Sequence, residues 1–381
     1  MDWIVFGDDW GRHVSTTQHL ILNLPAGDRV IWLDSIGMRE PKLRTQDLQR
    51  IWDKARGFFD RRSGGGGNGA SAGQHYRGSV ETVERIKPQV IPFHFHPLAR
   101  RYNARWLGRQ INKRLVDLDL QRPVLLTVNP LVIQYVGAIP HEKAAYLRLD
   151  NYAHFPGVDA DLVHRSEPRM FDYADAIFAT ARALFPGGAL DAKSHYLPQG
   201  VQYDHFASTS LEPAGRPVAG FYGLISEYID FDLVEKVARA MPDWRFEFVG
   251  TMMREQIPQR ILSIDNITIS GPVPFAELPR LLERWTAAWA PYVLDDHTRA
   301  SNPLKVREYL ASGLPAHCTP IPEATTLPAL FISDEAEQIA NWLARSLAED
   351  SPEKRHERRL SVQGESWASR STTLHQVMEA L

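Results

Sequence analysis

Residues 298–315 read TRASNPLKVREYLASGLP, and this stretch contains the signals for both ends of one helix. Asn302 is a favourable N-cap residue, and Pro303 suits the first position of a helix. Gly313 ends a helix well, and Pro315 cannot continue it. The sequence therefore predicts a helix over 303–312.

The first turn of this helix is suited to bind an anion, because its backbone N–H groups lack intrahelical partners and the helix dipole is positive there. The polar residues along one face of the helix are Asn302, Lys305, Glu308 and Ser312. Lys305 can neutralise phosphate oxygens, and Glu308, one turn further, can accept hydrogen bonds from a ribose diol. A solvent-exposed helix with a simple Lys–Glu pair is the alternative interpretation.

On either side of this helix, short apolar runs alternate with helical patterns, which is typical of parallel sheets covered by helices. In the second half the predicted strands are 218–222, 245–249, 267–269 and 287–292, and the predicted helices are 231–240, 275–284 and 335–347. In the first half the predicted strands are 3–6, 30–33, 123–128, 144–149 and 176–179, with a helix over 16–24. Residues 207–217, ASTSLEPAGRP, are small and polar and indicate a linker.

Several segments together resemble the GT-B glycosyltransferases that build bacterial polysaccharides. The segment from Asn302 to Pro315 resembles their donor-nucleotide signature, and this resemblance implies that Glu308 holds the nucleotide ribose and Lys305 the diphosphate. Residues 218–229 resemble the first strand and glycine turn of the donor domain, with Gly223 towards the phosphates. Residues 266–278 resemble the segment that borders the base, and residues 196–206 the domain junction.

The resemblance implies an α/β protein with the GT-B fold, in which two Rossmann-like domains face each other across a ligand cleft. We expect an acceptor-binding domain over 1–206 and a donor-binding domain over 207–365. Ser366 and Trp367 open a segment, 366–381, that is similar to the terminal helix returning to the first domain in this fold.

Two departures from the family pattern bear on mechanism. Many retaining relatives carry a second glutamate seven residues before the ribose-binding one, where this chain has Ser301. They also carry an arginine and a lysine after the first strand of the donor domain, where Ile225, Ser226 and Asp230 stand here. These differences favour an inverting reaction, and Ser301 is counted with Asn302 among the donor-binding residues.

Asp150 is the candidate general base. It ends the predicted strand 144–149, and residues at the carboxyl ends of parallel strands face the ligand crevice. The segment 146–157 resembles one in xanthan-type glucuronosyltransferases, where the matching aspartate is the base of an inverting displacement. The alternative interpretation is that Asp150 only caps the following turn.

Other polar residues are candidates for the acceptor side. They are Asp9, Arg12 and His13 in the loop after the first strand, together with Asn151 and His154. Asp8, Asp9 and His13, all in this loop, are the rivals for the base. We expect no metal site: His94 and His96 lack further clustered ligands, and Asp295-Asp296-His297 is unnecessary where Lys305 and a helix N-terminus already meet the diphosphate. No other cofactor is expected.

The chain has 381 residues and a net charge of −3, yet residues 42–114 hold 16 Lys and Arg against 5 Asp and Glu. Within them Leu98–Leu115 is helical in period, and Arg101, Arg105 and Arg109 lie along one side. This pattern favours an anionic membrane surface and a lipid-pyrophosphate acceptor, whereas the absence of a recognition motif argues against nucleic acid. The glycine-rich stretch 63–73 is expected to be a flexible loop rather than a phosphate cradle.

The single cysteine, Cys318, rules out an internal disulfide bond and favours a reducing compartment. Neither a signal peptide nor an apolar run of 18 residues is recognisable, so we expect a cytoplasmic protein that associates peripherally with the inner face of the membrane.

The predicted activity is transfer of a sugar from a nucleoside-diphosphate sugar, with UDP favoured, to a hydroxyl of a lipid-linked or polysaccharide acceptor. A nucleotide-sugar 2-epimerase of the same fold and a non-catalytic nucleotide- or glycan-binding relative are the alternatives. A nicotinamide oxidoreductase is disfavoured because the chain has no dinucleotide fingerprint.

Overall fold

The computed structural model describes residues 1–11, 14–39, 82–155, 157–212 and 215–381. Contacts between Cα atoms divide the chain into two compact units. The first unit comprises Met1–Phe178, Pro186–His195 and Leu374–Leu381, and the second comprises Ala179–Phe185 and Tyr196–Thr373. The predicted boundaries after residues 206 and 365 both fall inside the second unit.

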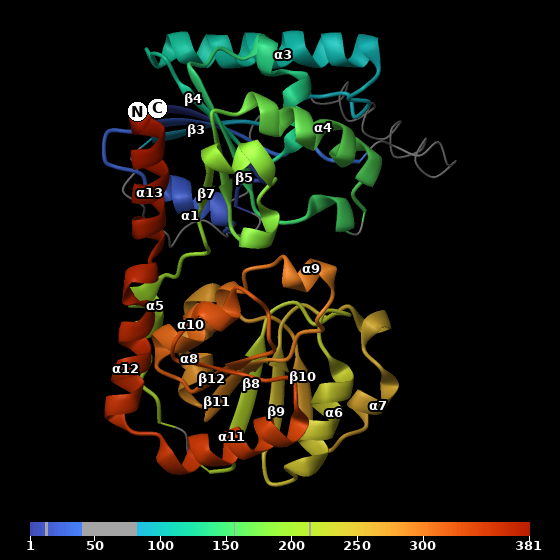
Figure 1. The fold of residues 1–381 in the computed structure, drawn as a ribbon, viewed down its shortest axis with the longest axis vertical. Helices are drawn as coiled ribbons and strands as arrows, with labels where there is room; N and C mark the ends of the chain where they lie inside the picture. Colours follow the sequence, from blue (N-terminus) through green and yellow to red (C-terminus); the bar gives the residue numbers. More distant parts are fainter. Residues whose placement is uncertain (12–13, 40–81, 156, 213–214) are drawn as a thin grey trace, which may run out of the picture. The chain divides into compact units, whose positions relative to one another are not determined.

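The first unit is built on a parallel sheet of seven strands in the order β3-β2-β1-β4-β5-β6-β7. Strands β3, β4, β5 and β7 of this sheet are labelled in Figure 1. The strands are β1 Asp2–Phe6, β2 Arg29–Leu33, β3 Thr82–Ile86, β4 Val124–Thr127, β5 Lys143–Arg148, β6 Ala176–Ala179 and β7 Ser194–Tyr196. Its helices are α1 Thr16–Leu22, α3 Pro97–Asp117 and α4 Ala160–Tyr173. Strands β1, β2, β4, β5 and β6 are largely buried and apolar, as expected of a parallel sheet covered on both faces, whereas the edge strands β3 and β7 carry polar residues and are less buried.

The second unit is built on a sheet of six strands in the order β10-β9-β8-β11-β12-β13. The strands are β8 Val218–Tyr222, β9 Arg245–Val249, β10 Ile267–Ser270, β11 Ala287–Ala290, β12 Ala316–Cys318 and β13 Leu330–Ile332. The helices are α5 Tyr203–Ala207, α6 Phe231–Ala240, α7 Gln259–Leu262, α8 Leu278–Glu283, α9 Asp296–Arg299, α10 Leu304–Ser312, α11 Ala336–Glu349 and α12 Pro352–Val362.

Alternation along β8 shows how the helices cover both faces of this sheet. Val218 and Tyr222 belong to a core with α8, α10 and α12, whereas Ala219 and Phe221 belong to a core with α6 and α11. Because side chains alternate between the faces of a strand, one five-residue strand contributes to two cores.

The carboxyl-terminal helix α13, Trp367–Ala380, begins in the second unit and ends in the first. Trp367 lies against Gly200, where an added Cβ would come within 2.7 Å of its ring. Further along, Leu374 and Met378 are fully buried, and the Nζ of Lys143 donates to the Met378 carbonyl at 2.9 Å. The last turns of α13 are therefore part of the core of the first unit.

Candidate functional site

The candidate site lies in the second unit, at the point where the strand order of its sheet reverses. β8 pairs with β9 on one side and with β11 on the other, and α10 follows β11 after the short helix α9. In open parallel sheets such a reversal leaves a crevice at the carboxyl ends of the strands, where ligands bind. The residues at this end are Tyr222, the last residue of β8, Gly223 after it, Gly250 after β9, and Lys305 and Glu308 of α10.

Gly223 is required by close packing against two other segments. Its φ is +145°, and an added Cβ would lie 2.2 Å from Cε of Lys305. Its N–H donates to the Val249 carbonyl at 2.9 Å, and its own carbonyl oxygen would be 1.8 Å from a Cβ at Gly250. The two glycines therefore let β8 and β9 end close together, and they leave room for the lysine side chain across the turn.

Lys305 is half-buried and has no hydrogen-bond or ion-pair partner within the described part of the chain. Burial lowers the pKa of its ammonium group, and the neighbouring Glu308 carboxylate offsets part of that effect. A half-buried cation without a partner costs free energy in the free protein. An anionic ligand would supply the missing partner.

Glu308 is buried, with 6% of its surface exposed, and it lies one turn after Lys305. Its Oε2 accepts a hydrogen bond from the Tyr222 hydroxyl at 2.5 Å. Burial raises the pKa of the Glu308 carboxyl, while the Tyr222 hydrogen bond and the Lys305 charge lower it. The sequence predicted Lys305 and Glu308 on one helix; in the structure Lys305 lies against Gly223 and Glu308 contacts the preceding residue, Tyr222.

Asn302 and Ser301 have other partners than the prediction gave them. The helix begins at Leu304 rather than Pro303, and its N-cap is Pro303, so Asn302 is not the cap. The Asn302 side chain instead donates to the Thr180 carbonyl at 2.7 Å and accepts from Arg307 at 2.6 Å. The Ser301 hydroxyl donates to the Thr298 carbonyl at 2.7 Å. A tertiary contact thus replaces the local capping bond that the sequence suggested.

Sequence reasoning missed Arg307, which is 1% exposed on α10. Besides Asn302, it pairs with the Glu365 carboxylate at 3.3 Å, and Glu365 also pairs with Arg370. A lone arginine in a helix usually lies at the surface, so the only available signal was its place between Val306 and Tyr309, both fully buried. This network fixes the start of α10 from inside the unit.

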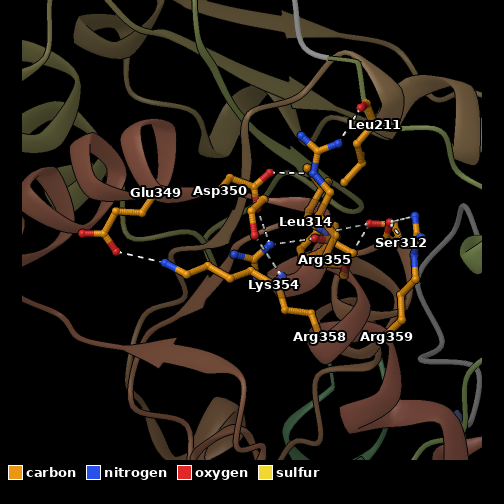
Figure 2. A network of polar contacts seen from close by, with 12 residues as sticks. Leu211, Ser312, Leu314, Glu349, Asp350, Lys354, Arg355, Arg358 and Arg359 are labelled. Atoms are coloured by element: carbon orange, nitrogen blue, oxygen red, sulfur yellow. Dashed lines mark hydrogen bonds and ion pairs between the residues drawn. The ribbon is translucent and has the colours of Figure 1, made fainter.

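Figure 2 shows the contacts at the opposite end of α10, where three arginines of α12 meet backbone carbonyls. Arg358 donates to the Gly313 carbonyl at 2.9 Å and Arg359 to the Ser312 carbonyl at 2.9 Å. Arg355 donates to the Leu211 carbonyl at 2.8 Å, and Asp350 pairs with both Arg355 and Arg358. Cations at a helix C-terminus complement the negative end of its dipole and satisfy its free carbonyls.

In the first unit Asp150 follows β5, as predicted from the sequence. Its Oδ1 accepts from the Asn151 N–H at 2.8 Å, which is the turn contact named as the alternative role. Beside it, burial raises the pKa of the Tyr152 hydroxyl, and the Asp8 and Asp150 carboxylates raise it further. Two aspartates that follow different strands of the sheet, β1 and β5, thus act electrostatically on one tyrosine.

The other acceptor-side candidates are less closely gathered. Burial raises the pKa of the Asp8 carboxyl. A hydrogen bond from Ser15 lowers this pKa, and the charge of Asp9 raises it. The Asp9 carbonyl accepts a long hydrogen bond, 3.5 Å, from the Gln18 side chain. His154 is exposed on the turn after Asn151. Arg12, His13 and the glycine-rich stretch 63–73 lie outside the described residues.

The basic segment predicted over 98–115 is the helix α3. Its buried face consists of Ala99, Asn103, Leu107, Gly108, Ile111 and Leu115. The opposite face exposes Arg101, Arg105 and Arg109, with Leu98 73% exposed and Tyr102 44% exposed. The side chains of Tyr102, Arg105, Trp106, Arg109 and Gln110 line a hollow of about 320 Å³ on this face. We call this exposed surface the α3 basic face.

Residues considered for a metal site have structural roles here. Asp295 caps α9 by accepting from the Thr298 N–H at 2.7 Å. Nδ1 of His94 is 2.6 Å from the Tyr135 hydroxyl beneath α3. Within the described ranges no group of three or more His, Cys, Asp or Glu side chains is arranged to hold a metal ion.

Comparison with solved structures gives the fold a name. HepE of Anabaena in complex with UDP and glucose matches with a TM-score of 0.61 at 12% identity, over 99% of each chain. The sucrose-phosphate synthase of Thermosynechococcus elongatus matches with a TM-score of 0.66 at 13% identity, over 100% of this chain and 98% of its own. The fold is GT-B. At these identities the match concerns the GT-B fold alone.

One curated relative shares sequence with the chain. It is the putative teichuronic acid biosynthesis glycosyltransferase TuaH of Bacillus subtilis strain 168, which is 29% identical over 154 residues. The alignment covers 38% of this chain and 39% of TuaH, so the similarity extends over less than half of either protein. No family model matches the sequence. In the described residues no helix is both long enough and apolar enough to cross a membrane.

Proposed function

We propose that the chain is a glycosyltransferase that moves a sugar from a nucleoside-diphosphate sugar to an acceptor hydroxyl, with a UDP-sugar as the favoured donor. The observation that carries this proposal is the unpartnered Lys305 ammonium group beside Gly223, one turn from the buried Glu308 carboxylate. The partial sequence similarity to TuaH and the GT-B fold, which HepE also has in its complex with UDP-glucose, support it.

Each group has a distinct task in this proposal. Lys305 and the N–H groups of the first turn of α10 bind the diphosphate and stabilise the charge that develops on it as the bond to the sugar breaks. Glu308 accepts hydrogen bonds from the ribose diol and so fixes the nucleotide. Gly223 allows the chain to pass close to the phosphates without a side chain in the way.

We further propose that the reaction inverts the anomeric carbon and that Asp150 is the general base. Asp150 takes the proton of the acceptor hydroxyl, the hydroxyl oxygen attacks the anomeric carbon, and the bond to the diphosphate breaks on the opposite side. General-base help of this kind is worth roughly 10²–10⁴ in rate. Asp8, whose carboxylate also raises the pKa of Tyr152, is the residue to substitute in parallel with Asp150 for comparison.

The acceptor in this proposal is a lipid-linked or polysaccharide glycan, and the α3 basic face binds anionic lipid at the inner face of the membrane. Arg101, Arg105 and Arg109 have no acidic partner among the described residues, and they alternate with exposed Leu98 and Tyr102. Each basic residue near an anionic surface contributes about 1 kcal/mol. Reversing the three charges should therefore weaken binding to phosphatidylglycerol vesicles at least about 100-fold. Arg345→Glu, an exposed arginine of α11, is the control.

The first test is nucleotide binding followed by transfer. The thermal midpoint of the full chain is measured with UDP, GDP, dTDP, CMP and NAD, and a ligand at about 100 times its Kd adds ~2.7 kcal/mol to stability. A shift with one nucleoside diphosphate identifies the donor class, and radiolabelled sugar is then offered with lipid-linked acceptors. Loss of transfer in Asp150→Asn, with donor binding intact, supports the base assignment. A shift with NAD alone, or with none of the diphosphates, refutes the donor site.

The same material separates the proposal from its alternatives. A 2-epimerase converts the free donor without any acceptor, which is visible by following UDP-N-acetylglucosamine alone. A non-catalytic binder gives the thermal shift but neither transfers nor converts the sugar.

A further inference from the structure

We propose that Tyr222 is a positioning residue that holds the Glu308 carboxylate in the orientation needed to receive the nucleotide ribose. This inference rests on the proposed function, because it concerns how the donor site tells a ribose from other groups. It is based on the contact between Tyr222, the last residue of β8, and Glu308 in the second turn of α10.

The geometry shows a hydroxyl committed to one oxygen of the carboxylate. Tyr222 is 6% exposed and donates from its hydroxyl to Glu308 Oε2 at 2.5 Å. Within the described chain Glu308 Oε1 receives no hydrogen bond. A carboxylate accepts several hydrogen bonds, so the donation at Oε2 leaves Oε1 available to a ribose hydroxyl.

The tyrosine is itself held rigidly, which a positioning role requires. Its ring meets Tyr309 edge-on, with centroids 5.2 Å apart and an interplanar angle of 90°, and lies 6.3 Å from Trp285. Its backbone N–H donates to the Tyr309 hydroxyl at 3.2 Å. Because the Tyr222 ring is packed on two sides, its hydroxyl has few alternative positions. The Glu308 carboxylate that accepts its hydrogen bond is therefore also restricted in orientation.

The hydrogen bond also keeps Glu308 in the form that can accept. Burial raises the pKa of the Glu308 carboxyl, and the Tyr222 donation is the larger of the two influences that lower it. Without the hydroxyl the carboxyl would protonate at a higher pH. A protonated carboxyl gives up acceptor capacity towards the ribose diol.

A purely structural tyrosine, whose hydroxyl simply needs a partner, would affect stability but not ligand selection. The test therefore uses a ligand pair, UDP and 2′-deoxy-UDP, that differs only in one ribose hydroxyl. Dissociation constants for both are measured across pH 5–8 in the wild type, Tyr222→Phe, Glu308→Gln and the control Tyr292→Phe. Burial raises the pKa of the Tyr292 hydroxyl and the charges of Cys318 and Glu308 raise it further, but within the described residues Tyr292 makes no hydrogen bond to the Glu308 carboxylate.

We expect the wild type and Tyr292→Phe to bind UDP more tightly than the deoxy analogue, and Glu308→Gln to lose most of that preference. Tyr222→Phe should weaken UDP binding about tenfold, reduce the preference for UDP, and move the loss of binding on acidification to higher pH. Thermal midpoints measured without ligand confirm that each variant is folded.

The outcomes distinguish a failure of the proposed function from a failure of the positioning role of Tyr222. If the wild type binds neither nucleotide, the proposed function fails. If the wild type prefers UDP and Glu308→Gln abolishes that preference, while Tyr222→Phe retains both the preference and the wild-type pH profile, the donor site stands and the positioning role of Tyr222 is refuted.

Discussion

Replacing Lys305 with alanine should weaken nucleotide binding while leaving the free protein at least as stable as before. The lysine side chain lies across Gly223, and its ammonium group is half-buried without a partner in the described chain. Burial has lowered its pKa, which means that the site disfavours the charged form until a compensating anion arrives. Binding the diphosphate provides that anion.

The size of the effect follows from the contact that is lost. A hydrogen bond to a charged group contributes about 1.5–3 kcal/mol, which corresponds to roughly 10- to 150-fold in affinity. The free protein loses no hydrogen bond or ion pair, and removal of a half-buried charge offsets the lost packing of the alkyl chain. The thermal midpoint of the free variant should therefore be unchanged or higher.

The assay combines isothermal titration with UDP and thermal unfolding of the free protein, for Lys305→Ala and for the matched control Lys236→Ala. Lys236 is exposed on α6. If Lys305→Ala binds UDP within twofold of the wild type, the lysine does not meet the diphosphate. A variant that loses binding only because its midpoint falls by many degrees would equally contradict the reasoning.

Three further outcomes follow from described contacts. Gly223→Ala should cost about 1–3 kcal/mol in urea unfolding, because the new methyl group meets a neighbouring side chain at 2.2 Å, whereas Gly187→Ala, which meets nothing within 4 Å, should cost less. Burial lowers the pKa of His317 to about 4, so as pH falls below 6.5 the unfolded state takes up a proton before the folded state does. The free energy of unfolding should therefore drop by up to about 3 kcal/mol by pH 4. The variant His317→Gln should show a flatter dependence of stability on pH. Asp350→Asn should destabilise the protein by roughly 1–3 kcal/mol, since it frees two arginines, but Glu349→Gln should change stability by under about 1 kcal/mol, because its ion pair is exposed. Equal unfolding midpoints for the last two variants would contradict the assignment.

The regular parts of the fold were predictable from sequence because local patterns determine them. The bounds of β8, α6 and β9 were predicted exactly, since each is a continuous apolar or amphipathic run between clear turn residues. The short strands β12 and β13, of three residues each, carry too little pattern to be seen. The helix α4 went unpredicted because it contains Pro168, which normally argues against a helix.

The candidate site was predictable in its chemistry but not in its supporting contacts. The spacing of Lys305 and Glu308 along one helix follows from the sequence, and so does a glycine at the turn after β8. Asn302 also bonds to Thr180 and Arg307 to Glu365, 122 and 58 residues away in the chain, so no local pattern could reveal these two contacts. The hydrogen bond between Tyr222 and Glu308, which are 86 residues apart, could not be predicted for the same reason.

The course of α13 sets an order on how the protein can fold as it is synthesised. Residues 374–381 complete the first unit, yet they follow the entire second unit in the chain. While the ribosome is still making the second unit, the sheet of the first therefore lacks the buried Leu374 and Met378 and the carbonyl that receives Lys143. Domains generally fold as units during synthesis. Of the two units, the first is thus begun earlier but completed later, and the apolar surface that buries Leu374 and Met378 stays uncovered during that interval.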